Sequence, residues 1–285
     1  MQLALFEEPD VHRRRVPDRL GQTVVTERPK SSIFTRGKGR TANYDYTLNP
    51  YTGCGFGCSY CFAAFFVADV EKRERWGEWV DVKTRGEREI LGKRGLKGAK
   101  IFMSSATDPY QPLEAKVALT RRIVELMAEP ERQPRLVVQT RSPLVARDLD
   151  LFRRYDALRV NMSITTDDDA VRKRFEPWCA SIDRRFEALE ECATAGIPIA
   201  VCVSPMLPIS DPERFARRLA DLKATAYYAM PFHPGKRDFA AGTRERAREI
   251  AAEYDWTDAE CRTAIEAMRR LLPALNGPVN AFSPQ

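Results

Sequence analysis

The strongest constraint on the fold is an alternation of short apolar runs with longer amphipathic stretches along most of the chain. Short apolar runs predict buried β-strands, and apolar residues that recur every three or four positions predict helices. The predicted strands are Tyr44 to Asn49, Lys100 to Ser104, Arg135 to Thr140, Arg159 to Thr165, Ile197 to Val203 and Thr225 to Met230. The predicted helices are Ala63 to Glu74, Ala115 to Met127, Leu144 to Arg153, Ile182 to Ala195, Pro212 to Leu222, Thr243 to Glu253 and Ala259 to Leu271. This order predicts parallel strands with right-handed crossovers, in either an open doubly wound sheet or a barrel.

We expect one large α/β domain between two segments of different character. A length of 285 residues suits one α/β barrel, and a 44% share of hydrophobic residues is enough for a sizeable core. Residues 1–42 contain Arg13-Arg14-Arg15 and Arg36-Gly37-Lys38-Gly39-Arg40 with little periodicity, which predicts an extended basic arm that folds only against the body or a ligand. The barrel is then expected over residues 43–235, and a C-terminal helical extension packed on it over residues 236–285.

Charge and cysteine usage indicate the kind of partner and the compartment. The chain has 46 Lys and Arg against 40 Asp and Glu, which suits an anionic partner such as nucleic acid, nucleotide or phosphate without selecting among them. Seven cysteines are an odd number and fit a reducing compartment better than a disulfide framework. We expect no membrane span, because the longest uncharged stretch contains glycines, cysteines and a proline, and no secretion signal. The expected location is cytoplasmic.

Three of the cysteines, Cys54, Cys58 and Cys61, lie within eight residues in the spacing C-x3-C-x2-C. The glycines between them allow the backbone to turn tightly enough for all three sulfurs to converge on one metal centre. Structural zinc normally takes four ligands, and the two histidines of the chain, His12 and His233, are far from this loop in sequence. An iron–sulfur cubane usually takes four thiolates, so three leave one iron open to an outside ligand. The spacing favours such a cluster over zinc.

The cysteine loop, with Tyr60 before its last cysteine and Phe62 after it, resembles the signature loop of radical S-adenosylmethionine enzymes. Other stretches resemble the branch related to spore photoproduct lyase, namely Asn49-Pro-Tyr-Thr-Gly-Cys54, Ser105-Ala-Thr-Asp-Pro-Tyr-Gln-Pro-Leu-Glu114, Thr140 to Asp150 and Arg174-Phe-Glu-Pro177. The resemblance runs from about Tyr44 to His233. It implies a partial (βα)6 barrel of the TIM type, with the cysteine loop at the C-terminal mouth of the strands, where barrel enzymes carry their chemistry.

For function, the resemblance implies a [4Fe-4S] cluster on Cys54, Cys58 and Cys61 and S-adenosylmethionine bound at the open iron. An electron from an external low-potential donor of the flavodoxin or ferredoxin type would cleave the sulfonium, and the resulting 5′-deoxyadenosyl radical would take hydrogen from the substrate. The branch and the basic charge favour an anionic substrate such as a nucleic-acid lesion or a nucleotide-like molecule. The alternatives are radical modification of a peptide or natural product, and a non-catalytic iron–sulfur or zinc protein that binds nucleic acid.

The resemblance also implies contacts to the cofactor. Arg141, at the end of the third predicted strand, matches a basic position expected to pair with the methionine carboxylate, which suits a guanidinium fork. Ser104 and Ser105 end the second predicted strand, where relatives meet the methionine amine. The further candidates are Phe62, through its backbone at the adenine edge, Ser163, at the ribose or carboxylate, and Ser204, near the adenine. For Ser104, Ser105 and Ser163, ordinary hydrogen bonding at the end of a strand is an equal alternative.

Two residues are candidates for the catalytic, substrate side of the site. Cys179 is a candidate hydrogen-atom donor, and His233 is a candidate acid, base or substrate contact. By resemblance, a spore photoproduct lyase needs a cysteine donor in the turn after the second strand, but here that turn reads Met103-Ser-Ser-Ala-Thr-Asp108. A serine O–H bond is too strong to supply hydrogen to a carbon radical, so we predict that this chain is not itself a spore photoproduct lyase. In the same turn, Asp108 is expected to form an Asx-type turn.

Overall fold

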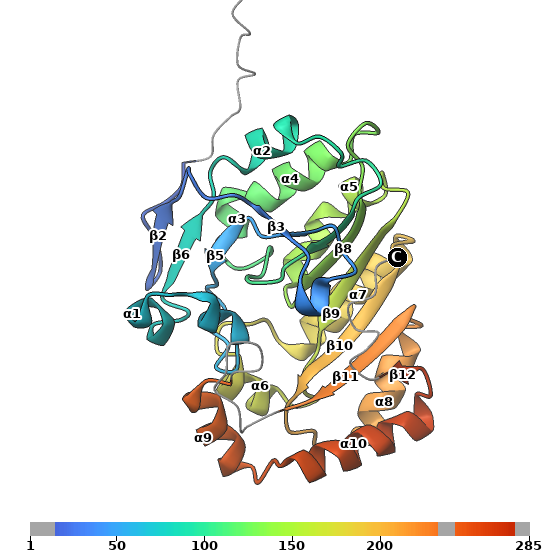
Figure 1. Ribbon diagram of the computed structural model, residues 1–285. Helices are drawn as coiled ribbons and strands as arrows, with labels where there is room; N and C mark the ends of the chain where they lie inside the picture. Colours follow the sequence, from blue (N-terminus) through green and yellow to red (C-terminus); the bar gives the residue numbers. More distant parts are fainter. Residues whose placement is uncertain (1–14, 233–242, 277–285) are drawn as a thin grey trace, which may run out of the picture.

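The computed structural model describes residues 15–232 and 243–276, and its main element is a curved sheet with strand order β12-β11-β10-β9-β8-β7-β4-β3 (Figure 1). The strands are β3 (Phe34–Arg36), β4 (Tyr46–Leu48), β7 (Lys100–Met103), β8 (Arg135–Thr140), β9 (Leu158–Ser163), β10 (Ile199–Met206), β11 (Ala226–Pro231) and β12 (Leu275–Asn276). Neighbouring strands pair in parallel except β3 with β4. The six predicted strands are therefore confirmed as β4 and β7 to β11, with the parallel pairing that their order predicts.

Helices follow most of the parallel strands and complete the expected partial (βα)6 barrel (Figure 1). The α-helices are α1 (Val70–Glu74), α2 (Gly86–Gly92), α3 (Glu114–Val117), α4 (Leu119–Met127), α5 (Leu149–Phe152), α6 (Asp169–Phe175), α7 (Ile182–Thr194), α8 (Pro212–Asp221), α9 (Glu245–Glu253) and α10 (Asp258–Leu271). The 3-10 turns are η1 (Gly39–Thr41), η2 (Phe62–Phe66) and η3 (Pro143–Asp148). No helix among the described residues has both the length and the apolar character that crossing a membrane requires.

Side chains of the parallel strands alternate between an apolar outer core and a polar barrel interior. In β9, Leu158, Val160 and Met162 belong to the main hydrophobic cluster, and the alternate residues are polar and buried because successive side chains point to opposite faces of a strand. The interior side chains bond to one another through Arg159 Nε to Asn161 Oδ1 at 2.8 Å, Gln139 Nε2 to Ser163 Oγ at 2.9 Å and Cys202 Sγ to Gln139 Oε1 at 3.4 Å. The interior is thus lined with groups that can meet a polar ligand.

A second, smaller sheet supports the start of the cysteine loop. Its order is β1-β2-β6-β5, formed by β1 (Arg19–Leu20), β2 (Thr23–Glu27), β6 (Trp79–Val82) and β5 (Tyr51–Gly53). β2 pairs in parallel with β6, and β6 pairs antiparallel with β5, the strand that leads into the cysteines. Parts of the N-terminal segment therefore form short strands that pair with later parts of the chain, β2 with β6 and β3 with β4.

Three of the predicted helices are interrupted. The helix expected over residues 144–153 is the 3-10 turn η3 followed by the four-residue helix α5. The helix expected over residues 63–74 is wrong as a continuous element, because Val67 is extended and Asp69 begins α1 by accepting a hydrogen bond from the Lys72 backbone N–H. The helix expected over residues 115–127 divides at Ala118, whose φ of 55° is left-handed. The two predicted C-terminal helices are present as α9 and α10, and α10 begins at a capping box between Thr257 and Glu260.

Candidate active site at the cysteine loop

The cysteine loop is fixed at the C-terminal ends of the barrel strands by the segment that follows β7. Gly53, the last residue of β5, has a φ of +78°, and a Cβ there would lie 2.6 Å from the Trp79 carbonyl oxygen. The Thr107 hydroxyl donates to the Gly53 carbonyl at 2.6 Å, and the Gly55 N–H donates to Gln111 Oε1 at 2.8 Å. A tight glycine turn and two hydrogen bonds therefore position the loop at the mouth of the barrel.

The three thiols of the loop differ in their electrostatic surroundings. Burial raises the pKa of Cys54 and raises that of Cys61 to about 11. The pKa of Cys58 is instead lowered, first by a hydrogen bond from Cys179, whose Sγ lies 3.8 Å away, and then by the charge of Arg141. Burial raises the pKa of Cys179, which keeps it as the protonated donor of this pair. Cys58 is therefore the thiol most readily available as a thiolate, the form that binds metal.

The donor set of the loop is three cysteines, with no histidine or carboxylate between them. Within residues 15–232 and 243–276, no group of three His, Cys, Asp or Glu side chains could hold a metal ion. Three cysteines on one loop can instead hold three irons of a cubane and leave the fourth without a protein ligand. This is the arrangement that the sequence predicts for Cys54, Cys58 and Cys61.

A buried ionic network contacts the cysteine loop. Arg141 Nη1 lies 3.3 Å from Cys58 Sγ and 3.1 Å from Glu176 Oε1, and it also donates to the Tyr60 hydroxyl. The Tyr60 hydroxyl and Arg185 Nη2 both donate to Glu176, which is 0% exposed. Burial alone would raise the pKa of Glu176, but the charges of Arg185 and Arg141 hold it at about 2. The carboxylate is thus ionised and anchors Arg141 beside Cys58.

Two nitrogens of the Arg141 guanidinium form no hydrogen bond to another side chain among the described residues. Its contacts to Cys58, Tyr60 and Glu176 all use Nη1. Its side chain is 18% exposed. A guanidinium presents several N–H groups in a planar fork, so these two nitrogens can bind a carboxylate.

Asp108 shapes the backbone around Arg141. Its carboxylate accepts hydrogen bonds from the Arg141 backbone N–H at 2.9 Å and from the Thr140 hydroxyl at 2.7 Å. The Tyr110 N–H donates to the same carboxylate at 2.9 Å, which confirms the predicted Asx-type turn. The turn after β7 and the end of β8 are therefore held together at the mouth.

The structure places the other predicted cofactor contacts around the same end of the barrel. Ser104, with a φ of +94°, donates through its hydroxyl to the Thr107 carbonyl. The hydroxyls of Ser105 and Ser163 accept from Asn49 Nδ2 and Gln139 Nε2, each at 2.9 Å. The remaining two are Phe62, in η2 with 46% of its surface exposed, and Ser204, in β10 before the cis bond to Pro205.

Of the two predicted catalytic residues, Cys179 lies against Cys58, and His233 lies outside the described residues. The residue that the sequence analysis did not assign is Glu176, although it belongs to the Arg174-Phe-Glu-Pro177 stretch that carries part of the resemblance. In the sequence, Glu176 stands out only as an acidic residue between apolar neighbours and next to a proline. This pattern does not reveal the two arginines that contact it.

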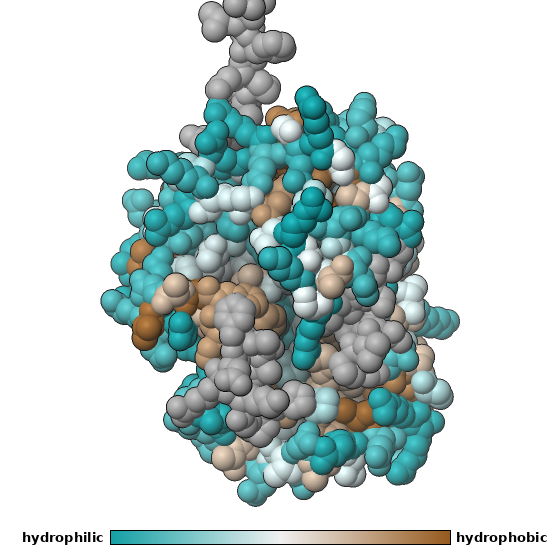
Figure 2. All heavy atoms as spheres, in the orientation of Figure 1, coloured by the Kyte–Doolittle hydropathy of each residue, from teal (hydrophilic) through white to brown (hydrophobic). Residues whose placement is uncertain are grey.

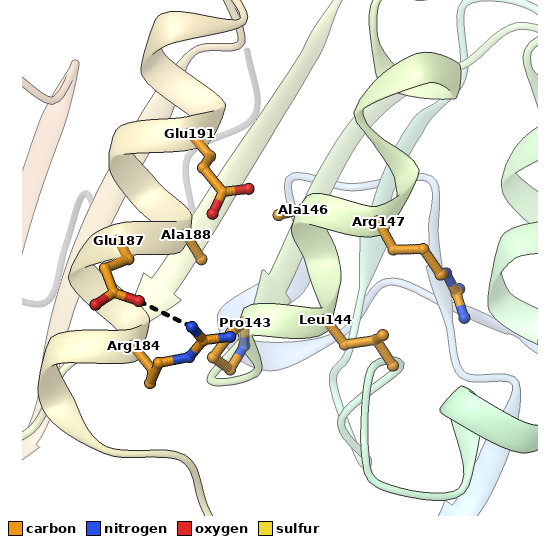
Figure 3. Close-up of a pocket in the computed structure, with 8 residues that line it drawn as sticks. All are labelled: Pro143, Leu144, Ala146, Arg147, Arg184, Glu187, Ala188 and Glu191. Carbon is orange, nitrogen blue, oxygen red and sulfur yellow. Dashed lines mark hydrogen bonds and ion pairs between the residues drawn. The ribbon is translucent and has the colours of Figure 1, made fainter.

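A separate groove of about 460 Å³ lies between η3 and α7 (Figure 3). Arg184 and Glu187 form an ion pair on its α7 side at 3.1 Å. None of the predicted cofactor, metal or catalytic residues lines this groove. It is therefore distinct from the cysteine loop and has no part in the site described above.

Comparisons with known proteins find one family model and several relatives of this chain. Residues 48–222 match the model of the Radical SAM superfamily. An uncharacterized protein of Methanocaldococcus jannaschii is 34% identical over 163 residues, which cover 57% of this chain and 61% of that protein. An uncharacterized protein of Acidianus two-tailed virus is 30% identical over 217 residues, which cover 69% of this chain and 70% of that protein. This chain thus spans less than two thirds of the length of the Methanocaldococcus relative.

Solved structures show the same fold. A variant of spore photoproduct lyase matches with a TM-score of 0.59 and 17% identity, over 93% of this chain and 86% of that chain. A second variant, with bound S-adenosylmethionine and dinucleoside spore photoproduct, matches with the same TM-score, identity and coverage. The expected partial barrel is confirmed by these likenesses. Together with the family match over residues 48–222, they show that this chain belongs to the radical SAM superfamily.

Proposed function

We propose that this protein is an enzyme that reductively cleaves S-adenosylmethionine at a [4Fe-4S] cluster held by Cys54, Cys58 and Cys61. When S-adenosylmethionine takes up one electron, it would split into methionine and a 5′-deoxyadenosyl radical. This radical would abstract hydrogen from the substrate. The observation that carries the proposal is the position of Arg141, 3.3 Å from Cys58 Sγ with two guanidinium nitrogens free of side-chain partners. A free cationic fork beside a cysteine loop suits a ligand whose carboxylate reaches the metal centre.

The residues around Arg141 keep this fork in place. Glu176 bonds to one guanidinium nitrogen at 3.1 Å, and Asp108 bonds to the Arg141 backbone at 2.9 Å. The side chain is therefore fixed from both ends before any ligand binds. Such preorganisation lowers the entropy that binding would otherwise cost.

The surroundings of the loop exclude water. Phe56, Trp76 and Trp79 are buried in one hydrophobic cluster with Cys54 and Cys58. Excluding water protects a reactive intermediate from side reactions and strengthens the electrostatic contacts of Arg141. The cluster of aromatic side chains thus supports radical chemistry at this loop.

For the substrate, we propose a nucleic-acid lesion or a nucleotide-like molecule. This class is supported by the likeness to spore photoproduct lyase structures. It is also supported by the positive charge of the chain, which has 46 basic and 40 acidic residues. Within this class, Cys179 is the proposed hydrogen-atom donor to a lesion other than spore photoproduct, and its thiol lies 3.8 Å from Cys58. The electron donor is proposed to be a flavodoxin or ferredoxin.

The test of the proposed function is the formation of 5′-deoxyadenosine. The full chain, reconstituted anaerobically with iron and sulfide, is reduced with dithionite and given S-adenosylmethionine. We expect 5′-deoxyadenosine from the wild type and none from Cys58→Ala. Cys192→Ala is the matched control, because Cys192 is a buried thiol on α7 and should leave the product unchanged. Failure of the wild type, with its cluster intact, would contradict the proposal.

A further inference from the structure

The segment after β3 crosses the open side of the partial barrel. β3 lies at one edge of the sheet, two strands from β7, and β11 lies near the other edge. Arg40, in the η1 turn that follows β3, has its Nη1 3.5 Å from the Met230 sulfur in β11. Figure 1 shows this blue turn over the concave side of the sheet, in front of β9 and β10. Any ligand that reaches the barrel interior from this side passes η1.

Four cations lie near the β3 edge of the sheet, on β3, on η1 with the residue before it, and directly after α2. Lys93 Nζ lies 4.7 Å from the centre of the Phe34 ring and 4.2 Å from that of the Tyr46 ring, and the Arg36 guanidinium carbon lies 5.0 Å from the Tyr46 ring. Two cations thus share one aromatic ring, which positions them without neutralising their charge. Lys38 precedes the first residue of η1, and Arg40 lies within it.

The charges of these four residues are available to a ligand. None of Arg36, Lys38, Arg40 and Lys93 forms an ion pair in the described part of the chain, whereas exposed arginines elsewhere, such as Arg217 with Glu213, do. Arg36, Lys38 and Arg40 are exposed. Figure 2 shows hydrophilic side chains along the face on which η1 lies. Four cations without ion-pair partners, three of them exposed, raise the local concentration of anions.

We propose that Arg36, Lys38, Arg40 and Lys93, the basic strip, bind the phosphodiester backbone of a nucleic acid along the β3 edge of the sheet and the η1 turn. The inference rests on the substrate class of the proposed function and adds the surface that receives it. Phosphate contacts need charge and fix register and orientation, so they require no pocket. Phe34 is buried and Tyr46 partly buried beneath the cations, so the strip has no apolar anchor for lipid, which favours nucleic acid over a membrane.

The test measures binding of the full chain to a fluorescent DNA oligonucleotide, single-stranded or duplex, at several salt concentrations without cofactor. In the variant R36Q/K38Q/R40Q, the slope of log affinity against log salt should fall by about 2 for single strands and about 3 for duplex, since each lost phosphate contact removes about 0.7 or 0.9. The matched control is R214Q/R217Q/R270Q, which removes the same charge from α8 and α10. It should keep the wild-type slope.

The possible results separate the inference from its alternatives. If both triple variants change the slope equally, DNA binding depends only on the net charge of the protein, and the inference about the basic strip is overturned. It is also overturned if the wild type binds vesicles of phosphatidylserine but not DNA. If the triple variant fails to fold, Lys38→Gln alone should lower the single-strand slope by about 0.7, and an unchanged slope overturns the inference. Strip-dependent DNA binding by a protein that makes no 5′-deoxyadenosine would contradict the proposed function and leave the strip standing.

Discussion

Glu176 connects more of the candidate site than any single cysteine does. Its buried carboxylate receives hydrogen bonds from Arg141, Arg185 and Tyr60, and from the Thr165 hydroxyl at 2.7 Å. Tyr60 lies between two cysteines of the loop, so the same carboxylate links the loop to α7 and to the end of β8. Loss of its charge would leave two guanidinium groups without their shared partner.

We therefore expect Glu176→Gln to lower the free energy of unfolding by about 3–5 kcal/mol at neutral pH, because it breaks a buried ion pair. The pKa of Glu176, about 2, is below its ordinary 4.5, so the stabilisation by its charge is complete above about pH 4.5 and is lost as pH falls toward 2. Denaturant unfolding across this range should show the difference between wild type and variant shrinking with acid. Glu187→Gln, in an exposed pair with Arg184, should cost at most about 1 kcal/mol. Equal losses in the two variants would refute this account of Glu176.

Arg141→Ala should weaken binding of S-adenosylmethionine about ten- to a hundredfold, because a charge-assisted pair contributes roughly 1.5 to 3 kcal/mol. The iron content should stay at the wild-type value. Arg141→Lys should give an intermediate affinity, since it keeps the charge but loses the fork. Equilibrium dialysis with labelled cofactor measures both variants. An affinity for Arg141→Ala equal to that of the wild type would show that the carboxylate binds elsewhere.

At the scale of elements, the sequence predicted the strands that build the barrel better than those that support the loop. β8 spans the predicted residues, Arg135–Thr140, because its apolar run is short and buried. β2, β5 and β6 were not predicted, because they are short and gain their hydrogen bonds from partners far away in sequence. The hydrophobic periodicity also predicted η2 and α1 as one helix, because a periodic pattern does not reveal that Asp69 caps the start of α1.

The candidate site was likewise predictable only where its residues lie close together in sequence. The spacing of the cysteines predicted their grouping, because all three lie on one short loop. The contacts of Glu176 with Arg141 and Arg185 were not predictable, since they join three separate elements of the fold.

The tight turn into the cysteine loop gives a prediction for this element. Gly53→Ala should lower both the free energy of unfolding, by about 1–3 kcal/mol, and the iron bound on reconstitution, because a Cβ would lie 2.6 Å from the Trp79 carbonyl oxygen at a φ of +78°. Gly92→Ala, in α2 with open space around the added Cβ, is the matched control and should be neutral or slightly stabilising. Thermal unfolding and iron analysis measure the two effects. Normal iron binding by Gly53→Ala would show that the turn does not position the cysteines.

For the molecule as a whole, the turn after β7 predicts that the reaction differs from that of spore photoproduct lyase. Ser104 and Ser105 occupy this turn, and a serine hydroxyl is a poor hydrogen-atom donor. Reduced protein with S-adenosylmethionine should therefore not convert spore-photoproduct dinucleotide cleanly to thymines, as followed by chromatography. Clean repair would refute the prediction, and its loss in Cys179→Ala would then identify Cys179 as the donor.

The most direct test of the central claim is the paramagnetic spectrum and metal content of the anaerobically reconstituted full chain, with and without S-adenosylmethionine. We predict about four irons per chain, a reduced cubane signal that changes when the cofactor is added, and loss of both in Cys54→Ala, Cys58→Ala or Cys61→Ala. Tetrahedral zinc in the loop would contradict the proposed cluster. A cubane signal that does not change when S-adenosylmethionine is added would contradict the proposed binding of the cofactor at the cluster.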